Sequence, residues 1–201
     1  MAARSHQPGT EVRGPIKSAA CAAALEVETD RLRIRLLAPA DENLYCMLYT
    51  DPDTMRFIGP PLTFARAQKS FRAAIRLLDR TAEKQIVLAI EERSSSQAIG
   101  ICGLHHIDMQ RGVAEAGIIL HPAARARGYS REGLAALVDR AFERLPIDEV
   151  WVQISVDYAI VERLVISVGF KRAPERAQAG GPAWQVWRID RASRTSAMRF
   201  Q

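Results

Sequence analysis

The sequence predicts a mixed α/β fold, and two kinds of hydrophobic pattern predict it. Apolar and polar residues alternate over 32–36 and again over 150–156, which is typical of half-buried strands. Apolar residues recur every three or four positions over 67–78 and 134–145, which is typical of amphipathic helices. The length of 201 residues suits one domain with tails, and we place that domain at about 26–190.

The first third of the domain is expected to form one strand and two helices. Pro39 ends the strand, and Asp41 can cap a short helix. A loop rich in Pro and Gly follows over 52–61. Thr63 can then cap a longer helix that reaches Leu78.

The middle of the chain predicts three antiparallel strands. They cover 86–90, 98–107 and 116–120, and turn residues at 94–96 and 110–112 join them. Because the turns are short, we expect neighbouring strands to pair directly.

The last third predicts a helix, a strand, a helix and two strands. Pro122 and Pro146 bracket the first helix, and the strand over 150–156 follows. The segment 158–168 is rich in β-branched residues, which favour a strand, but its helical spacing and the possible cap Asp157 favour a helix. We expect a helix there.

The final strands begin at Gly169-Phe170 and after the turn Gly180-Gly181-Pro182. The predicted order is therefore β-α-α-β-β-β-α-β-α-β-β.

Charge and composition separate the two ends from the domain. The net charge is +5, but residues 1–24 carry three basic residues against one acidic residue, and 191–201 carry three and none. The segment between them is neutral, whereas a nucleic-acid-binding domain would concentrate Lys and Arg on its folded part. We predict a disordered tail over 1–25, a basic tail over 191–201, and no nucleic-acid partner.

Cysteine usage and hydropathy bear on the compartment. Cys21, Cys46 and Cys102 form no CxxC pair and no even framework, which favours a reducing, cytoplasmic setting. No apolar run reaches the ~18–20 residues that span a bilayer, so no membrane association is expected.

The segment Arg125-Ala126-Arg127-Gly128-Tyr129-Ser130-Arg131 carries the clearest chemical signal. It lies between a predicted strand and the start of a predicted helix. Gly lets the backbone approach a ligand closely, and the first N–H groups of a helix have no internal partner. Such a site can hold a pyrophosphate; an ordinary helix start with solvated arginines is the alternative.

His121-Pro122 followed by Arg125-x-x-Gly128-x-Ser130 resembles the pyrophosphate-binding motif of the GNAT superfamily of acyl-CoA-dependent N-acetyltransferases. The surrounding residues are similar to the branch that acetylates N-terminal alanines of ribosomal proteins, over nearly all of 26–175. They are Glu28-Thr29-Asp30-Arg31-Leu32, Pro39-Ala40-Asp41, Ala114-Glu115-Ala116-Gly117 and Gly169-Phe170. The resemblance implies a central, mostly antiparallel twisted sheet of about six or seven strands, flanked by about four helices.

The resemblance also implies which residues bind acetyl-CoA, without any metal. Backbone groups at the pyrophosphate would come from Arg125, Arg127, Gly128, Tyr129, Ser130 and Arg131. Ile119 and Leu120 would supply main-chain contacts to the pantetheine arm, and the thioester would lie between strands 116–120 and 150–156. Ser130 departs from the usual Gly or Ala, but its hydroxyl is small and can donate to a phosphate oxygen.

Two departures from the family pattern concern catalysis. Tyr158 stands where the family usually has Asn, and Val165 stands where it often has a Tyr that protonates the thiolate. Glu115 is the candidate base, acting through a water; an exposed strand glutamate is the alternative. An α-amine and a lysine differ by ~2.6 pKa units, so sparse catalytic groups suit an amine of low pKa.

Other chemistries fit the sequence poorly. His105 and His106 are adjacent on a predicted strand, so they should point to opposite faces and share no metal. The residues around Ser130 miss the Gly-x-Ser-x-Gly spacing by one position, and neither a P-loop nor GxGxxG occurs. Hydrolase, NTPase and dehydrogenase functions are excluded.

We therefore predict a cytoplasmic N-acetyltransferase that moves an acetyl group from acetyl-CoA directly to a primary amine. Protein or peptide N-termini, polyamines, amino acids and antibiotics all stay open as acceptors, as does the oligomeric state. The alternative is a GNAT-like module that binds acyl-CoA or a partner without turnover.

Overall fold

A computed structural model describes residues 18–77, 84–156, 158–174 and 184–198. Its centre is one sheet in the strand order β1-β2-β3-β4-β5-β6-β8-β7. The strands are β1 (Val27–Glu28), β2 (Leu32–Leu36), β3 (Gln85–Glu92), β4 (Gln97–Asp108), β5 (Val113–Leu120), β6 (Glu149–Ser155), β7 (Lys171–Arg172) and β8 (Trp184–Asp190). Every neighbouring pair is antiparallel except β5 and β6. The predicted fold class is confirmed, and the short edge strand β1 brings the count to eight.

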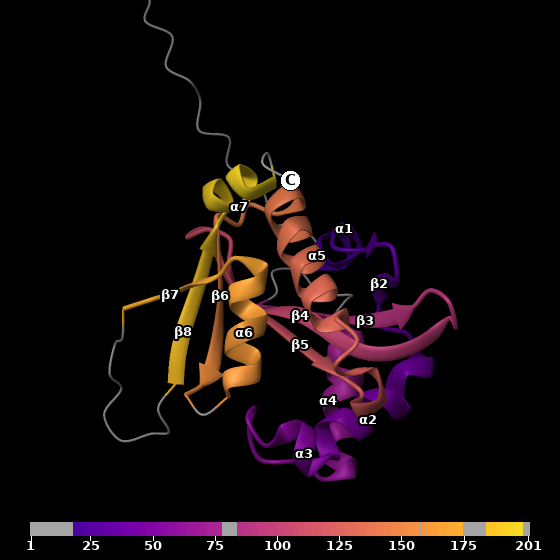
Figure 1. Ribbon diagram of the computed structural model, residues 1–201. Helices are drawn as coiled ribbons and strands as arrows, with labels where there is room; N and C mark the ends of the chain where they lie inside the picture. The colour runs from indigo at the N-terminus through magenta and orange to yellow at the C-terminus, as the bar shows by residue number, and fades with distance from the viewer. Residues whose placement is uncertain (1–17, 78–83, 157, 175–183, 199–201) are drawn as a thin grey trace, which may run out of the picture.

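Helices cover both faces of the sheet. They are α1 (Ser18–Ala24), α2 (Glu42–Thr50), α3 (Pro52–Met55), α4 (Phe64–Leu77), α5 (Tyr129–Arg144), α6 (Ala159–Val168) and α7 (Arg191–Met198), with 3-10 turns η1 (Pro39–Asp41) and η2 (Pro122–Ala124). Alternate residues of β3 feed two hydrophobic clusters: Leu88 packs in the cluster that includes α1, α5 and α6, and Val87 packs with α2 and α4. Figure 1 shows the sheet between these two sets of helices.

Strands β5 and β6 pair over only three positions and then diverge. The parallel pairs are Val113 with Glu149, Ala114 with Val150, and Glu115 with Trp151. Beyond them β5 continues along β4, and β6 continues along β8. The two strand ends therefore separate, as Figure 1 shows between the labels β5 and β6.

The ambiguous segment 158–168 is a helix, as expected. It begins at Ala159, with Tyr158 as the residue just before it, and ends at Gly169 in a left-handed conformation (φ 106°). The predicted cap Asp157, the turn at 180–182 and the predicted helix end at Leu78 lie outside the described residues.

The structure differs from the expectation for the end of the N-terminal tail. Residues 18–24 form helix α1, and Cys21, Ala22 and Leu25 are buried in the larger cluster. Small Ala side chains allow this short helix to pack closely against the core, an effect that the sequence alone does not distinguish from an Ala-rich tail.

Arginines near the C-terminus also do structural work that a basic tail does not predict. Arg194 donates to both carboxylate oxygens of Asp139 at 2.6 and 2.9 Å, and to the carbonyl of Val168 at 2.7 Å. Arg191 donates to the carbonyls of Phe142 and Leu145 around the end of α5. Both arginines therefore satisfy carbonyl groups at helix ends, which stabilises those ends.

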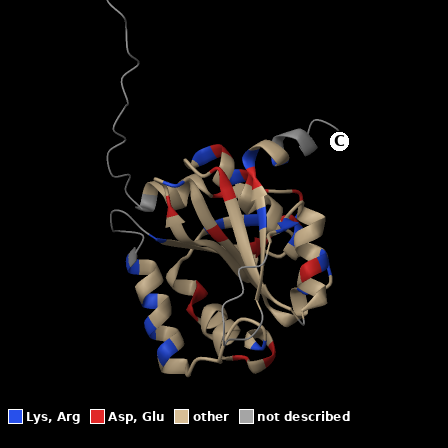
Figure 2. Ribbon diagram, turned by 90° about the vertical axis from the view of Figure 1, so that its left-hand side faces the viewer, with Lys and Arg blue, Asp and Glu red and all other residues tan. Residues whose placement is uncertain are grey.

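The neutral net charge of the domain conceals a local basic surface on α4. Figure 2 shows blue bands along this helix, whose exposed cations are Arg66, Lys69, Arg72 and Arg76. Within the described part of the chain, no helix is long and apolar enough to cross a bilayer.

Candidate functional site

The segment that joins β5 to α5 is shaped by two left-handed residues. Ala126 has φ 60°, and Gly128, at the N-cap of α5, has φ 80°. These turns direct the chain so that α5 begins at Tyr129, near the end of β5 and beside α6. The first N–H groups of α5, including those of Ser130 and Arg131, have no acceptor within the helix. Together with the helix dipole they favour an anion at this point.

Glu92 fixes two side chains of this segment. The Tyr129 hydroxyl donates to Glu92, and Arg127 Nη2 lies 3.1 Å from the same carboxylate oxygen. The hydrogen bond from Tyr129 lowers the pKa of Glu92 and raises the pKa of the phenol. Tyr129 is only 4% exposed. Its ring therefore belongs to the core, and its backbone N–H is one of the first N–H groups of α5.

Arg31, from the turn before β2, holds the same segment from the other side. Its guanidinium donates to the carbonyl of Arg127 at 2.9 Å, pairs with Glu132 at 2.6 Å, and lies over the Tyr129 ring at 4.8 Å. Burial opposes ionisation of Glu132, but hydrogen bonds from Thr29 and Arg31 outweigh it and lower the pKa of Glu132. The sequence suggested no such role for Arg31, which entered only as part of the run Glu28-Thr29-Asp30-Arg31-Leu32 that carries the family resemblance.

The Arg125 side chain turns back toward the end of β5. Its Nε donates to the carbonyl of Leu120 at 3.1 Å, and its Nη2 donates to Thr54 Oγ1 at 2.6 Å. Thr54 is 8% exposed and lies in α3. Arg125 therefore connects this loop to a segment about 70 residues earlier in the chain, a contact that no sequence pattern predicts.

The remaining residues assigned to the binding site lie at the end of β5 and in the first turn of α5. Ile119 packs with the α2 and α4 cluster, and Leu120 is buried in the cluster on the opposite face. Ser130 is half-buried in the first turn of α5. Arg131 reaches α6, where its Nε lies 3.4 Å from the carbonyl of Ser167.

Glu115 lies at the last paired position before β5 and β6 diverge. Its Oε2 is 2.7 Å from His106 Nδ1, with the glutamate side chain 21% and the histidine 73% exposed. An irregularity between His105 and Asp108, with φ 47° at His106, makes this contact possible and stacks the imidazole on Trp151.

The expectation that the two histidines simply alternate between faces therefore fails at this irregularity, because the extra residue re-aims the side chain. Burial lowers the pKa of His105, so that this neighbouring imidazole is neutral near pH 7. Among the residues that the structure describes, no three His, Cys, Asp or Glu side chains gather as a metal site would require.

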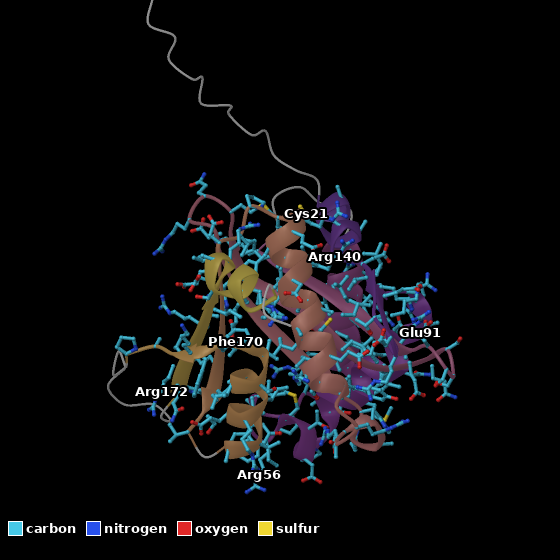
Figure 3. All side chains as sticks on the ribbon, turned by 45° about the horizontal axis from the view of Figure 1, so that its top comes forward. Cys21, Arg56, Glu91, Arg140, Phe170 and Arg172 are labelled. Atoms are coloured by element: carbon cyan, nitrogen blue, oxygen red, sulfur yellow. The ribbon has the colours of Figure 1, made fainter. Side chains whose placement is uncertain are left out.

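Tyr158 lies where β6 leads into α6, and its ring stacks on Phe57. The ring centroids are 4.0 Å apart with an angle of 20° between the planes. Arg56, whose guanidinium lies over Phe57, marks this end of the molecule in Figure 3. Val165 is 1% exposed and packs in the core, so this position of α6 offers no proton donor.

A family comparison decides what this arrangement is. Residues 31–171 match the model of the acetyltransferase (GNAT) domain, which is most of the chain. The chain belongs to the GNAT acetyltransferase family. The resemblance stated from the motif around Gly128 is thereby confirmed, and so is its assignment as an N-acetyltransferase.

Individual relatives of this GNAT protein are distant in sequence and close in fold. An uncharacterised N-acetyltransferase p20 of Bacillus licheniformis is 23% identical over 145 residues, which cover 72% of this chain and 81% of that protein. The spermidine N-acetyltransferase of Vibrio cholerae, solved with CoA and spermine, has a TM-score of 0.70 at 19% identity and covers 83% of this chain and 99% of its own.

A RimL ribosomal L7/L12 α-N-protein acetyltransferase, solved with coenzyme A, has a TM-score of 0.69 at 14% identity, over 81% of this chain and 95% of its own. At these identities the structures establish the shared fold. They do not select between a polyamine and a protein N-terminus as the acceptor.

Proposed function

We propose that this protein transfers an acetyl group from acetyl-CoA directly to a primary amine of low pKa, such as a peptide N-terminal α-amine. The observation that carries the proposal is the separation of β5 and β6 beyond their three paired positions, followed along the chain by the left-handed Gly128 and the first turn of α5. We assign the thioester to this separation and the pyrophosphate of CoA to the helix start. The structures of two relatives with CoA support this ligand.

The backbone of 125–131 is assigned to the pyrophosphate, and the β5 backbone at Ile119 and Leu120 to the pantetheine arm. The side chains of Arg127 and Tyr129 are already engaged by Glu92. They act by fixing the loop, so that its N–H groups are arranged before the ligand arrives. Preorganised donors of this kind lower the free-energy cost of binding.

Glu115 is assigned as the base that accepts a proton from the amine, directly or through a water. Its contact with His106 connects it to an exposed imidazole, which gives the proton a path to solvent. The neutral amine then attacks the thioester carbon, the C–S bond breaks, and CoA leaves as a thiolate. The nitrogen loses its second proton as the amide forms, and this proton neutralises the thiolate, directly or through water.

We assign segment 51–64 to the acceptor site, because it contacts Arg125, which follows β5, and Tyr158, which follows β6. The composition of this segment favours a single amine over a polyamine. Asp51 and Asp53 are the only carboxylates between residues 51 and 64, and Asp51 is engaged by both the N–H and the hydroxyl of Thr54. Met55, Phe57 and Ile58 make the rest of this segment largely apolar. A polyamine with several charges would need more unpaired carboxylates, whereas an N-terminal residue presents one amine beside an apolar group.

One experiment tests the proposal. Thermal unfolding is measured with acetyl-CoA, and thiol release is measured with peptides, polyamines and amino acids as acceptors. We expect stabilisation by acetyl-CoA and faster thiol release with peptides that carry a free α-amine. Stabilisation without thiol release for any amine would instead identify a non-catalytic acyl-CoA-binding module, the alternative that the buried Val165 keeps open.

A further inference from the structure

Segment 51–64 joins α2 to α4 and contains α3. It contacts one residue that follows β5 and one that follows β6, the two strands that separate beyond their three paired positions. Thr54 contacts Arg125, which follows β5, and Phe57 stacks on Tyr158, which follows β6. Figure 1 shows α3 at the end of the molecule toward which both strands point. The segment therefore bridges the two diverging strand ends.

The Thr54 hydroxyl is the central atom of the first contact. It has a single hydrogen, which it donates to Asp51, so it accepts the hydrogen bond from Arg125 Nη2 at 2.6 Å. Asp51 also accepts from the backbone N–H of Thr54 at 2.8 Å. These bonds lower the pKa of Asp51, and the charge of Arg125 adds to the effect. The chain Asp51–Thr54–Arg125–Leu120 thus joins the start of α3 to the end of β5.

We propose that Arg125 is a positioning residue that couples the acyl-CoA site to the acceptor site. The inference rests on the proposed function. The Arg125 backbone belongs to the segment assigned to the pyrophosphate, while its side chain holds segment 51–64. When CoA bonds to the pre-arranged N–H groups of 125–131, it restrains the Arg125 backbone further, and through the Arg125 side chain it also restrains segment 51–64. Such coupling is reciprocal, so an ordered segment 51–64 strengthens CoA binding by the same factor.

Hydrogen exchange with coenzyme A itself as the probe tests the coupling without any knowledge of the acceptor. Four proteins are compared with and without CoA: wild type, Thr54→Val, Thr54→Ser and Thr50→Val. Thr50 is the matched control, because its hydroxyl bonds to the carbonyls of Cys46 and Met47 within α2. Ser at position 54 keeps the hydroxyl and should restore the coupling.

In wild type, Thr54→Ser and Thr50→Val, we expect CoA to slow exchange in both 125–131 and 51–64. In Thr54→Val, CoA should still slow exchange in 125–131, but its effect on 51–64 should fall about tenfold, as expected for losing a hydrogen bond to a charged group. Undiminished slowing over 51–64 in Thr54→Val overturns the inference alone. Absence of slowing over 125–131 in wild type overturns the proposed function itself.

Kinetics with an amine accepted in the thiol-release assay give a second readout. Thr54→Val should raise KM for the amine about tenfold and, because the coupling is reciprocal, weaken CoA binding by a similar factor, with recovery of both in Thr54→Ser. Arg125→Met should raise KM for the amine similarly, and the double variant should be no worse than either single variant. Multiplication of the two single effects would show that Arg125 and Thr54 act independently and would overturn the coupling.

Discussion

Gly128→Val should abolish stabilisation by CoA while the protein stays folded. Gly128 has φ 80°, a region that a β-branched residue rarely adopts. A Cβ there would also lie 3.2 Å from the Arg31 guanidinium. The variant either keeps this strain or rotates its backbone out of the left-handed region. The rotation turns the first N–H groups of α5 away from the ligand.

The magnitudes separate backbone strain from loss of the ligand site. A left-handed conformation costs a non-glycine residue ~1–2 kcal/mol, a part of the ~5–15 kcal/mol that typically holds a domain folded. CoA at 100 times its Kd adds ~2.7 kcal/mol, which corresponds to a Tm rise of roughly 5–10 °C for a protein of this size. Gly169→Val is the matched control, because Gly169 also has positive φ (106°) but ends α6 and meets only Ile189 and Arg194.

The assay is thermal unfolding of both variants and wild type at saturating CoA. Both variants should lose a few degrees of Tm without ligand, but only Gly128→Val should lose the rise with CoA. A full CoA-dependent rise in Gly128→Val would refute the placement of the pyrophosphate at α5. Loss of the rise in both variants would show that strain, rather than position, accounts for the effect.

Four further substitutions, at three positions, test the chemistry and the C-terminal helix. Glu115→Gln should lower kcat/KM about 100-fold across the pH range, since the amide cannot accept the proton of the amine; an unchanged kcat/KM would make Glu115 structural. Tyr158→Phe keeps the stack on Phe57 and should change kcat/KM less than about threefold. Tyr158→Ala removes the ring and should weaken CoA binding. A loss of 10²–10⁴-fold in kcat for Tyr158→Phe would instead identify the Tyr158 hydroxyl as a proton donor. Arg194→Met should destabilise the protein by about 3–5 kcal/mol, because it leaves Asp139 as an unpaired, largely buried carboxylate; equal denaturation midpoints for variant and wild type would contradict this.

The fold could be predicted because it depends on periodicity. Alternation over 32–36 and 150–156 corresponds to β2 and β6, and three-four spacing over 134–145 corresponds to α5. The helix start at Gly128 could also be predicted, because a glycine directly before a helical pattern indicates the residue at which the helix begins.

The contacts around that helix start could not be predicted. The bond from Arg125 to Thr54 joins a loop to the short helix α3, about 70 residues apart, and a contact between such segments leaves no period in the sequence. The contact of His106 with Glu115 depends on an irregularity in β4. One unpaired residue in a strand reverses every inference from alternation beyond it. Net charge misled at the C-terminus for a related reason, because counting Arg194 as a solvated charge ignores its pairing with Asp139.

The absence of a proton-donating side chain at Val165 in α6 restricts the choice of acceptor amine more than it restricts the departure of CoA. A thiol has a pKa near ~8.5, so CoA can leave as a thiolate without a general acid. The step that needs a proton to be removed is the formation of the neutral amine. The amine must therefore carry most of the pH dependence. At pH 7 the neutral fraction of an α-amine exceeds that of a lysine by roughly 400-fold, from a pKa difference of ~2.6 units.

Two peptides of the same sequence are compared. The first has a free α-amine and an acetylated lysine, and the second has an acetylated α-amine and a free lysine. We expect a higher kcat/KM for the first peptide. The ratio should be largest near pH 7 and should shrink between pH 8 and pH 10, as the lysine amine becomes neutral. The measurement is initial thiol release with the two peptides across this range. A ratio that stays constant with pH would contradict this expectation and would show that acceptor choice depends on the shape of the acceptor rather than on the pKa of its amine.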